Sequence, residues 1–221
     1  MPFDDCSYYY IYDDIILRHK KYNVAGGIDI EASYYTTNGK FIATYDYGQW
    51  FQDGVAAVEV NDKWGYIDRN GFQETLFEYE DADYASWGLL PVKYNGKWGA
   101  INQYNCQHIV IPFEWDAIGQ IERVEGSNRC LIIVKSGDKE GCITNRNKTV
   151  LPCRYNDIKI IGEYLLVRNS GQKALYDLYG NQIVPMGEYY DIMPTPFDII
   201  VADEVGHGNI FFDNKGHRIK I

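Results

Sequence analysis

A short pattern recurs at nearly regular intervals along the 221 residues, and this repetition constrains the fold more than any other feature. The hexapeptide KWGYID at 63–68 is echoed 34 residues later by KWGAIN at 97–102. Weaker copies stand at 139–144, 172–177 and 208–213. A turn residue lies seven residues after the tryptophan position of each copy, and an N-terminal copy adds one more. These turn residues are Gly39, Gly71, Asn105, Asn147, Gly180 and Gly216, with spacings of 32, 34, 42, 33 and 36 residues.

Each repeat carries further elements in a fixed order. An alternating strand such as 55–60 (VAAVEV) precedes the tryptophan strand, and a tight turn such as Asn61-Asp62 joins the two. After the second turn comes a strand that reaches an aliphatic–proline step. We expect the strand to end there, because proline cannot donate to the ladder. These prolines are Pro112, Pro152 and Pro185.

An aromatic residue followed by an acid or an amide then recurs as a connector. We expect the acid or amide to bond backbone groups two residues on and so to stabilise a local turn. Each repeat is therefore predicted to be a three-stranded antiparallel meander plus a connector. The connector pairs are Tyr45-Asp46, Tyr79-Glu80, Trp115-Asp116, Tyr155-Asn156 and Tyr190-Asp191.

Composition agrees with an all-β fold. The chain has 20 Tyr, 9 Phe and 5 Trp, together 15% of its residues, and aromatic residues favour pleated, half-buried surfaces. Its 21 glycines suit hairpin turns, which need positive φ. No segment combines helical periodicity with helix start and stop signals. We therefore predict an all-β tandem array of about six short antiparallel meander repeats of 32–42 residues each.

The segment GKWGAIN at 96–102, followed by Ile111-Pro112 and Trp115-Asp116, resembles the WG repeat, a bacterial β-repeat usually found in tandem. The resemblance spans about residues 28 to 221. It implies a repeat scaffold that acts as a protein-interaction module and has no catalytic residue. The signature is clearest at Trp64-Gly65 and Trp98-Gly99; Glu140, Lys173 and Asn209 replace the tryptophan, and Ala174 and Ile210 the glycine, in later copies.

The tryptophan–glycine pair has a physical explanation. A β-unit of this size cannot bury its apolar face alone and must stack on a neighbour. A tryptophan buries roughly 150–250 Å² and can cover the bare backbone of a nearby strand glycine. We therefore expect Trp64 and Trp98 to lie in the core. The alternative is an exposed stacking platform for sugars or peptides.

The two ends of the chain suggest a division into an N-terminal segment, 1–27, and a repeat domain, 28–221. The last repeat stops before any aromatic–acid connector, and the segment Tyr8–Ile15 resembles such a connector with a following strand. Residues 1–27 therefore either begin the array as a half-unit or complete the last repeat, as in a propeller that closes its ring. We expect an open array within a single structural domain, because ~36 residues per unit is short beside propeller blades of about 40–45.

No catalytic constellation is recognisable. None of the six serines lies in Gly-x-Ser-x-Gly, and no glycine-rich phosphate loop is present. His207 and His217 could meet across a hairpin, but they lack a third metal ligand in register. The acids at 78–83 do not follow the order of a calcium loop, so a solvated loop is the better interpretation. We expect no catalytic residue, no metal and no cofactor.

The formal net charge of −10 and a pI near 4.8 disfavour nucleic acid as a partner, because an acidic surface repels phosphate backbones. No apolar run approaches the ~20 residues of a membrane helix. The segment 1–5 lacks the start of a signal peptide, and the five cysteines lack regular spacing. We therefore expect a cytoplasmic chain; a chain from which a leader had been removed would give the same pattern.

These features favour a non-catalytic scaffold for protein–protein interaction, with an acidic inhibitor or immunity-type protein for a basic partner as a narrower form. A glycan-binding module that uses connector aromatics is the alternative. The connectors 78–88 and 119–129 are the candidate surfaces, and 119–129 is interpreted as an insertion that stacking does not need. The candidate residues are Glu78, Glu80, Asp81, Asp83, Tyr84, Trp87, Glu122, Arg123 and Glu125.

Overall fold

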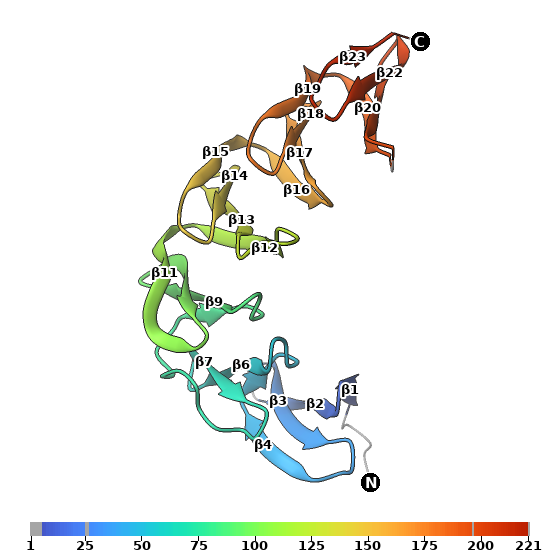
Figure 1. Ribbon diagram of the computed structural model, residues 1–221. Helices are drawn as coiled ribbons and strands as arrows, with labels where there is room; N and C mark the ends of the chain where they lie inside the picture. The colour runs from blue at the N-terminus through green and yellow to red at the C-terminus, as the bar shows by residue number, and fades with distance from the viewer. Residues whose placement is uncertain (1–5, 25–26, 196, 221) are drawn as a thin grey trace. The chain divides into compact units, whose positions relative to one another are not determined.

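The computed structural model describes residues 6–24, 27–195 and 197–220. This part of the chain forms six separate antiparallel sheets of three or four strands, and none of them closes into a barrel (Figure 1). The predicted all-β array of about six meander repeats is confirmed. The chain divides into two compact units, 1–114 and 115–221. This boundary does not coincide with the division at 27/28 expected from the sequence.

Three sheets lie in the first unit, where the last strand extends one residue past the boundary. The first sheet consists of β1 (Cys6–Tyr12), β2 (Ile15–Val24), β3 (Gly27–Thr36) and β4 (Phe41–Tyr45). The second consists of β5 (Tyr47–Gly48), β6 (Val55–Val60) and β7 (Lys63–Asp68). The third consists of β8 (Asp81–Ala82), β9 (Leu89–Tyr94), β10 (Lys97–Asn102) and β11 (Asn105–Trp115).

Three further sheets, each four-stranded, lie in the second unit. The fourth sheet consists of β12 (Ala117–Arg123), β13 (Cys130–Ser136), β14 (Lys139–Thr144) and β15 (Thr149–Tyr155). The fifth consists of β16 (Asp157–Ile161), β17 (Tyr164–Asn169), β18 (Gln172–Asp177) and β19 (Gln182–Gly187). The sixth consists of β20 (Tyr189–Pro194), β21 (Ile199–Glu204), β22 (Gly208–Asp213) and β23 (Arg218–Ile219). In every sheet the strands follow one another in chain order.

The connectors are strands, which makes the repeat four-stranded where the sequence predicted three strands and a connector. The acid or amide of the aromatic pair starts the next sheet, as Asp116 N–H donates to the Lys135 carbonyl. Its side chain accepts an N–H from the next hairpin turn, 2.7 Å from Asp46 to Asn61 N and 2.9 Å from Glu80 to Gly96 N. The prediction that the acid bonds a backbone group two residues on is therefore wrong for these pairs. Each carboxylate instead stabilises a hairpin turn that lies 15 or 16 residues further along the chain.

The N-terminal segment belongs to the first sheet. β1 pairs with β2 from Cys6–Lys21 to Tyr12–Ile15, because the tight turn at Asp13, with φ 52°, folds the chain back on itself. At the other end of the chain, β23 pairs with β22. The last sheet thus has its own fourth strand, and residues 6–12 complete the first repeat.

The three prolines of the aliphatic–proline steps lie inside strands, so the prediction that they end strands is wrong. Pro152 lies within β15, where two steps of β14, from Glu140 to Cys142, face four steps of β15, from Leu151 to Tyr155. This bulge lies on an edge strand, where the missing proline N–H costs no ladder bond. Pro112 and Pro185 hold the equivalent positions in β11 and β19.

The glycine after the tryptophan position is explained by this bulge. A Cβ built on Gly99 would lie 2.6 Å from the Ile111 carbonyl oxygen and 2.7 Å from the Phe113 ring. Gly65 and Gly141 are crowded in the same way, by Phe77 and by Cys153. The segment that follows the second turn, and not the tryptophan, therefore covers the glycine, which corrects the sequence interpretation; at Gly141 this segment is the bulged strand β15.

Repeats without the glycine have smaller bulges. At Ala174 two steps of β18 face only three of β19, since Lys173 pairs with Gly187 and Leu175 with Val184. At Ser33 the pairing is regular across the position, and the Ser33 hydroxyl lies 2.9 Å from Thr44 Oγ1. The larger the bulge opposite this position, the smaller is the side chain that occupies it.

Tyrosines two residues after the tryptophan position, and not the tryptophans, are the largest buried aromatics. Trp64 and Trp98 are only half-buried, which corrects the expectation that they are core residues. Tyr34 and Tyr66 are fully buried. The Tyr34 hydroxyl donates to the Gln49 carbonyl at 2.6 Å, and the Tyr66 hydroxyl lies 2.6 Å from the carbonyl oxygen of Asp83 in the next sheet. Each therefore bonds its repeat to the following one.

The turn after the tryptophan strand has a recurrent side-chain cap. Asp68 Oδ1 accepts the N–H groups of Asn70 and Phe72 at 2.9 and 2.8 Å, and Gly71 has a φ of 84°. The same position is occupied by Thr36, Asn102, Thr144, Asp177 and Asp213, each of which caps its own turn. Of the predicted turn residues, Asn105 differs, because it is the first residue of β11.

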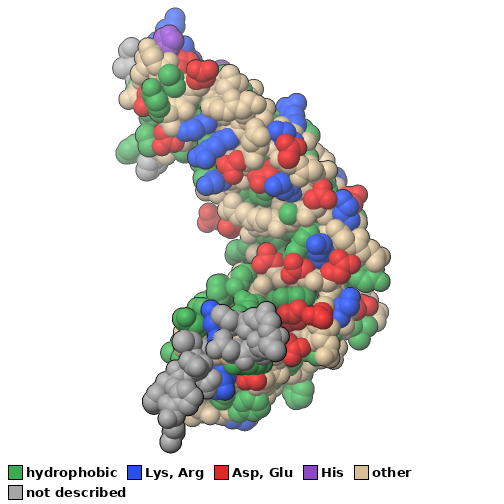
Figure 2. All heavy atoms as spheres, turned by 180° about the vertical axis from the view of Figure 1, so that it is seen from behind, with side chains coloured by type: hydrophobic (Ala, Val, Ile, Leu, Met, Phe, Trp, Pro, Cys, Tyr) green, Lys and Arg blue, Asp and Glu red, His purple; other side chains and the backbone are tan. Residues whose placement is uncertain are grey.

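Charged side chains of both signs are mixed over the face of the molecule seen in Figure 2. The net charge of −10 is therefore not gathered into one acidic patch on that face. Among the described residues, no helix has the length and apolar character needed to span a membrane.

Candidate interaction groove

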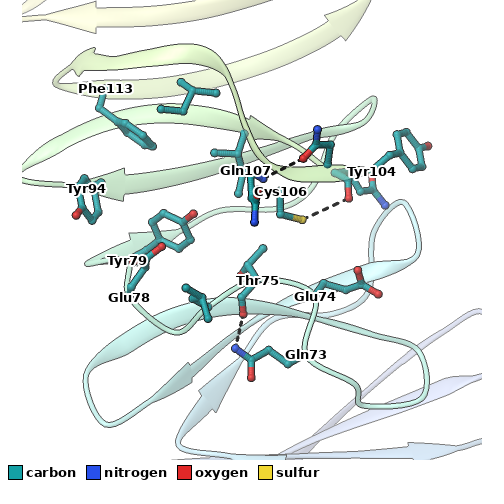
Figure 3. A pocket seen from close by; sticks show the side chains of 15 residues that line it. Gln73, Glu74, Thr75, Glu78, Tyr79, Tyr94, Tyr104, Cys106, Gln107 and Phe113 are labelled. Carbon is teal, nitrogen blue, oxygen red and sulfur yellow. Dashed lines mark hydrogen bonds between the residues drawn. The ribbon is translucent and has the colours of Figure 1, made fainter.

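A groove with a volume of ≈ 830 Å³ lies in the first unit, between the segments that follow β7 and β10 (Figure 3). One wall is the stretch 73–79, and the other is 103–109 at the start of β11. Tyr79, Tyr94 and Phe113 close one end. Protein binding pockets for small ligands and side chains have volumes of roughly 300–1,000 Å³, so this groove has room for several side chains.

The groove exists because the second repeat has no regular fourth strand. Residues 73–79 form no named strand; they pair with β7 at two isolated bridges, Ile67 to Gln73 and Trp64 to Tyr79, and Glu74 N–H donates to the Tyr66 carbonyl at 2.8 Å. Between them Thr75 takes the place of a buried aliphatic residue, and its Oγ1 accepts the Tyr66 N–H at 2.9 Å. The next side chain, Leu76, is 66% exposed.

The inner end of the groove is aromatic. The Tyr79 and Tyr94 rings meet edge to face at 6.3 Å, and Tyr94 lies 5.6 Å from Phe113. Burial, followed by the charge of Glu78, raises the pKa of Tyr79 to about 12. The phenol is therefore neutral at physiological pH and offers an apolar ring with one hydrogen-bonding group.

The rim of the groove combines exposed apolar side chains with acids. Tyr104 is 86% exposed and Ile109 is 51% exposed, both on the wall opposite Leu76. Glu74 and Glu78 are exposed on the other wall. Within the described chain, the lining carries these two carboxylates and no cationic side chain. The groove is thus apolar with a negative margin.

The one thiol in the lining is unsuited to nucleophilic chemistry. Cys106 Sγ lies 3.5 Å from the Gln103 carbonyl oxygen. Burial, with a smaller contribution from the charge of Glu74, raises the pKa of the Cys106 thiol. A nucleophilic cysteine needs the opposite shift, because the thiolate is the reactive form.

The structure separates the acids predicted as one surface at 78–88. Glu78 lies on the groove, whereas Glu80 caps the next hairpin turn. Asp81 and Asp83 are half-buried and accept the N–H groups of Ala82 and Tyr84. In the described part of the chain, no three metal-ligating side chains come together.

The connector aromatics of this segment form no free platform. The Tyr84 ring stacks on Trp50 with centroids 4.4 Å apart and an angle of 23° between the planes. One face of each ring is therefore covered by the other ring and cannot stack on a ligand. Trp87 is exposed in a turn with φ 53°, where its backbone N–H donates to the Asp53 carboxylate. Sequence reasoning missed the lining residues Leu76, Tyr104 and Ile109, because the polar Thr75 at an otherwise aliphatic position of the repeat was not interpreted as the sign of a missing strand.

The second predicted surface, 119–129, is largely regular structure. Residues up to Arg123 belong to β12, which pairs with β13 through a bulge between Ile118 and Ile121. The Gln120 side chain also bonds the Ile160 backbone at 3.1 and 3.2 Å. The interpretation of this segment as a dispensable insertion is therefore wrong. Glu122, Arg123 and Glu125 are exposed and line a hollow of ≈ 390 Å³.

A separate group of acids in the first unit surrounds Glu59. Burial is the main cause that raises the pKa of this carboxyl, and the charges of Asp62 and Asp46 add to the shift. A raised pKa in the folded chain means that the ionised form opposes folding at neutral pH. Asp46 cannot relieve the repulsion, since its carboxylate is fixed on the Asn61 N–H.

We expect Glu59→Gln to raise the free energy of unfolding at pH 7 by about 0.5 kcal/mol, a figure kept small because solvent and salt screen this half-exposed group. The gain should shrink as the pH falls through the raised pKa of the folded chain and vanish below the ordinary glutamate pKa of 4.5, where the carboxyl is protonated in both states. Urea unfolding at pH 7 and pH 4 measures it. A gain of the same size at both pH values would contradict the electrostatic explanation.

The family model described as WG containing repeat matches residues 33–64 and 64–98. Residues 33–98 are two adjacent WG repeats. These two WG repeats contain the second sheet, the Trp64-Gly65 pair and the first wall of the groove. A comparison with curated proteins found no match.

Solved structures give a distant likeness. A Kluyveromyces lactis Hsv2 with loop 6CD replaced by a Gly-Ser linker is 11% identical, with 78% of this chain and 64% of that chain covered and a TM-score of 0.41. The WD40 domain of Neurospora crassa Pan2 is 12% identical, with 96% and 76% covered and a TM-score of 0.39. The matched region spans less than two thirds of that Hsv2 chain. Nothing about binding follows from similarity at this level.

Proposed function

We propose that this WG-repeat chain is a non-catalytic scaffold that binds a protein partner through the groove of its first unit. The observation that carries the proposal is the exposure of Leu76, Tyr104 and Ile109 around an aromatic interior. Apolar and aromatic side chains at a concave surface are typical of the centre of protein interfaces. The raised pKa of Cys106 supports the non-catalytic part of the proposal.

The partner that suits the groove is an extended segment with apolar side chains flanked by lysine or arginine. Its apolar side chains would fill the space between Leu76 and Ile109. Glu74 and Glu78 at the rim, with the net charge of −10, complement basic flanks. An inhibitor of a basic protein is the narrower form of this proposal, supported by the same acidic rim.

Peptide selection on the full chain tests the proposal. A random twelve-residue display library is panned against the protein, and the selected peptides are measured by fluorescence anisotropy. We expect peptides that combine apolar and basic residues. Their affinity should fall by about tenfold or more in Leu76→Ser and in Ile109→Ser, as at interface hot spots. Glu78→Gln should weaken the binding mainly at low salt.

The matched control is Phe197→Ser, which removes another highly exposed apolar side chain, in the second unit. It should leave peptide affinity unchanged. Peptides that bind equally well to Leu76→Ser and Ile109→Ser would overturn the assignment of the groove. A glycan array probed with the same preparation addresses the alternative: glycan binding without peptide selection would replace the protein partner by a carbohydrate.

A further inference from the structure

A small hollow in the second unit has the opposite charge to the chain as a whole. It has a volume of ≈ 330 Å³ and lies between the loop before β13 and the turn that joins β14 to β15. Arg129, Arg146 and Lys148 line it, together with neutral polar side chains and no carboxylate. Elsewhere, on the face seen in Figure 2, acids and bases are mixed. Three cations gathered in a chain of net charge −10 require an explanation.

The two walls of the hollow are held together by Asn145. Its Oδ1 accepts the Cys130 N–H at 3.2 Å, and its Nδ2 donates to the Asn128 carbonyl at 3.0 Å. Asn145 N–H also donates to the Cys130 carbonyl at 3.1 Å. Three hydrogen bonds therefore join the loop and the turn at the base of the hollow, and the segments that carry the three cations are held side by side.

The cap of this turn carries no charge. Thr144 Oγ1 accepts the N–H groups of Arg146 and Lys148 at 3.3 and 3.2 Å. In the last repeat the same position is Asp213, whose carboxylate caps the turn and also lies 2.9 Å from His217 Nδ1. His217 occupies the position of Lys148. The fourth repeat thus keeps the turn geometry without the counter-charge that the last repeat supplies.

Arg129 is fixed in place while its charge stays unpaired. Its Nη2 donates to the Leu178 carbonyl at 2.7 Å, and its guanidinium lies 4.7 Å from the centre of the Tyr179 ring. The other terminal nitrogen, Nη1, is buried without a hydrogen-bond acceptor. Within the described chain, no carboxylate forms an ion pair with Arg129, Arg146 or Lys148.

We propose that this hollow binds a phosphoryl group. The planar guanidinium of an arginine presents parallel N–H groups that match the geometry of phosphate oxygens, and a lysine adds a compact positive charge. Three cations favour a doubly charged phosphoryl group as the ligand over a carboxylate, because a carboxylate carries only a single negative charge. The volume lies at the small end of the range for ligand sites, roughly 300–1,000 Å³, and suits one such group with a short attachment. The group is carried either by a free small phosphate or by a phosphorylated side chain of a protein.

Substitutions at the cap separate charge from structure. Thr144→Asp places in this turn the residue that caps the turns at Asp68, Asp177 and Asp213, so the fold should survive while the counter-charge is added. Thr144→Asn introduces the neutral cap used at Asn102. With inorganic phosphate as the probe, titrated calorimetrically against the full chain, we expect Thr144→Asp to weaken binding about tenfold and Thr144→Asn to change it little.

Further arms complete the test at constant ionic strength. Arg146→Gln should weaken phosphate binding to a similar degree, whereas Lys215→Gln, at the equivalent position of the last repeat, should leave it unchanged. Acetate should bind much more weakly than phosphate. Tighter binding of a phosphoserine peptide than of inorganic phosphate assigns the group to a protein ligand; equal binding assigns it to a small phosphate. Equal affinities of folded Thr144→Asp and Thr144→Asn for phosphate, or of acetate and phosphate for the native chain, would overturn the proposal.

Discussion

Replacement of Gly99 by alanine is expected to lower the free energy of unfolding by about 3 kcal/mol, at the upper end of overpacking effects. The added methyl would stand 2.6 Å from the Ile111 carbonyl oxygen. That oxygen belongs to the backbone of β11, so relief requires β11 to move away from β10. Equilibrium urea unfolding of the full chain, followed by tryptophan fluorescence, measures the change.

The control for Gly99→Ala is the reverse change at Ala174, where the smaller bulge already accommodates a methyl group. Ala174→Gly should cost about 1 kcal/mol, from the extra backbone entropy and the lost contacts of one methyl. If Gly99→Ala proved as mild as Ala174→Gly, the bulge would not be the reason for the glycine of the WG motif.

The second large effect is expected for Tyr66→Phe, with a loss of about 2 kcal/mol in the free energy of unfolding, typical of a buried hydrogen-bonding group left without its partner. The Tyr66 hydroxyl lies 2.6 and 2.8 Å from the carbonyl oxygens of Asp83 and Pro91, in the next sheet. Phenylalanine keeps the ring but removes the hydroxyl from both contacts, of which the one to the Pro91 oxygen is buried. Thermal and urea unfolding both report the loss.

Tyr104→Phe serves as the control, because the Tyr104 side chain is almost fully exposed and its hydroxyl is solvated. It should leave stability within about 0.5 kcal/mol of the parent chain. A Tyr66→Phe chain as stable as Tyr104→Phe would show that the hydroxyl does not join the second and third repeats.

The repeat and its turns could be predicted because their causes are local in sequence. Asn61-Asp62 and Asn95-Gly96 have positive φ in the structure, as hairpin turns of this kind require. The register that gave Gly71 and Gly216 as turn residues is confirmed in the same way. Short-range steric preferences decide these positions, and one sequence displays them directly.

The fourth strand and its bulge could not be predicted, because they depend on pairing between segments. Proline at 152 was interpreted as a strand end, whereas an edge strand tolerates it. Likewise, the aromatic–acid pairs were assigned to local turns, although Asp46 and Glu80 reach the next hairpin. The tryptophans are the largest aromatic residues of the motif, and Trp64 lies on the same face of β7 as Tyr66, because the two are two residues apart in a strand. Trp64 nevertheless packs only partly against the core cluster in which Tyr66 is fully buried, and its position near the start of the strand did not show this in the sequence.

The groove was predicted only in part, at Glu78. The irregular connector 78–88 is visible in the sequence, whereas the stretch just before it, where Thr75 stands at an otherwise aliphatic position, was not predicted. That substitution is the signal that was available: a polar residue at a position which the other repeats fill with Ile111, Leu151 and Val184. The polar residue marks the second repeat, in which the segment after the turn does not form a regular fourth strand.

Because every sheet in the described chain takes its strands in order from one continuous stretch of sequence, a copy of that stretch is a complete building block. A duplication in the gene that keeps the reading frame would add a sheet without interrupting the pairing of any other. A deletion of the same length would remove one cleanly. The number of repeats can therefore change in single genetic steps, and the unequal spacings of 32 to 42 residues show that the array accepts units of different length.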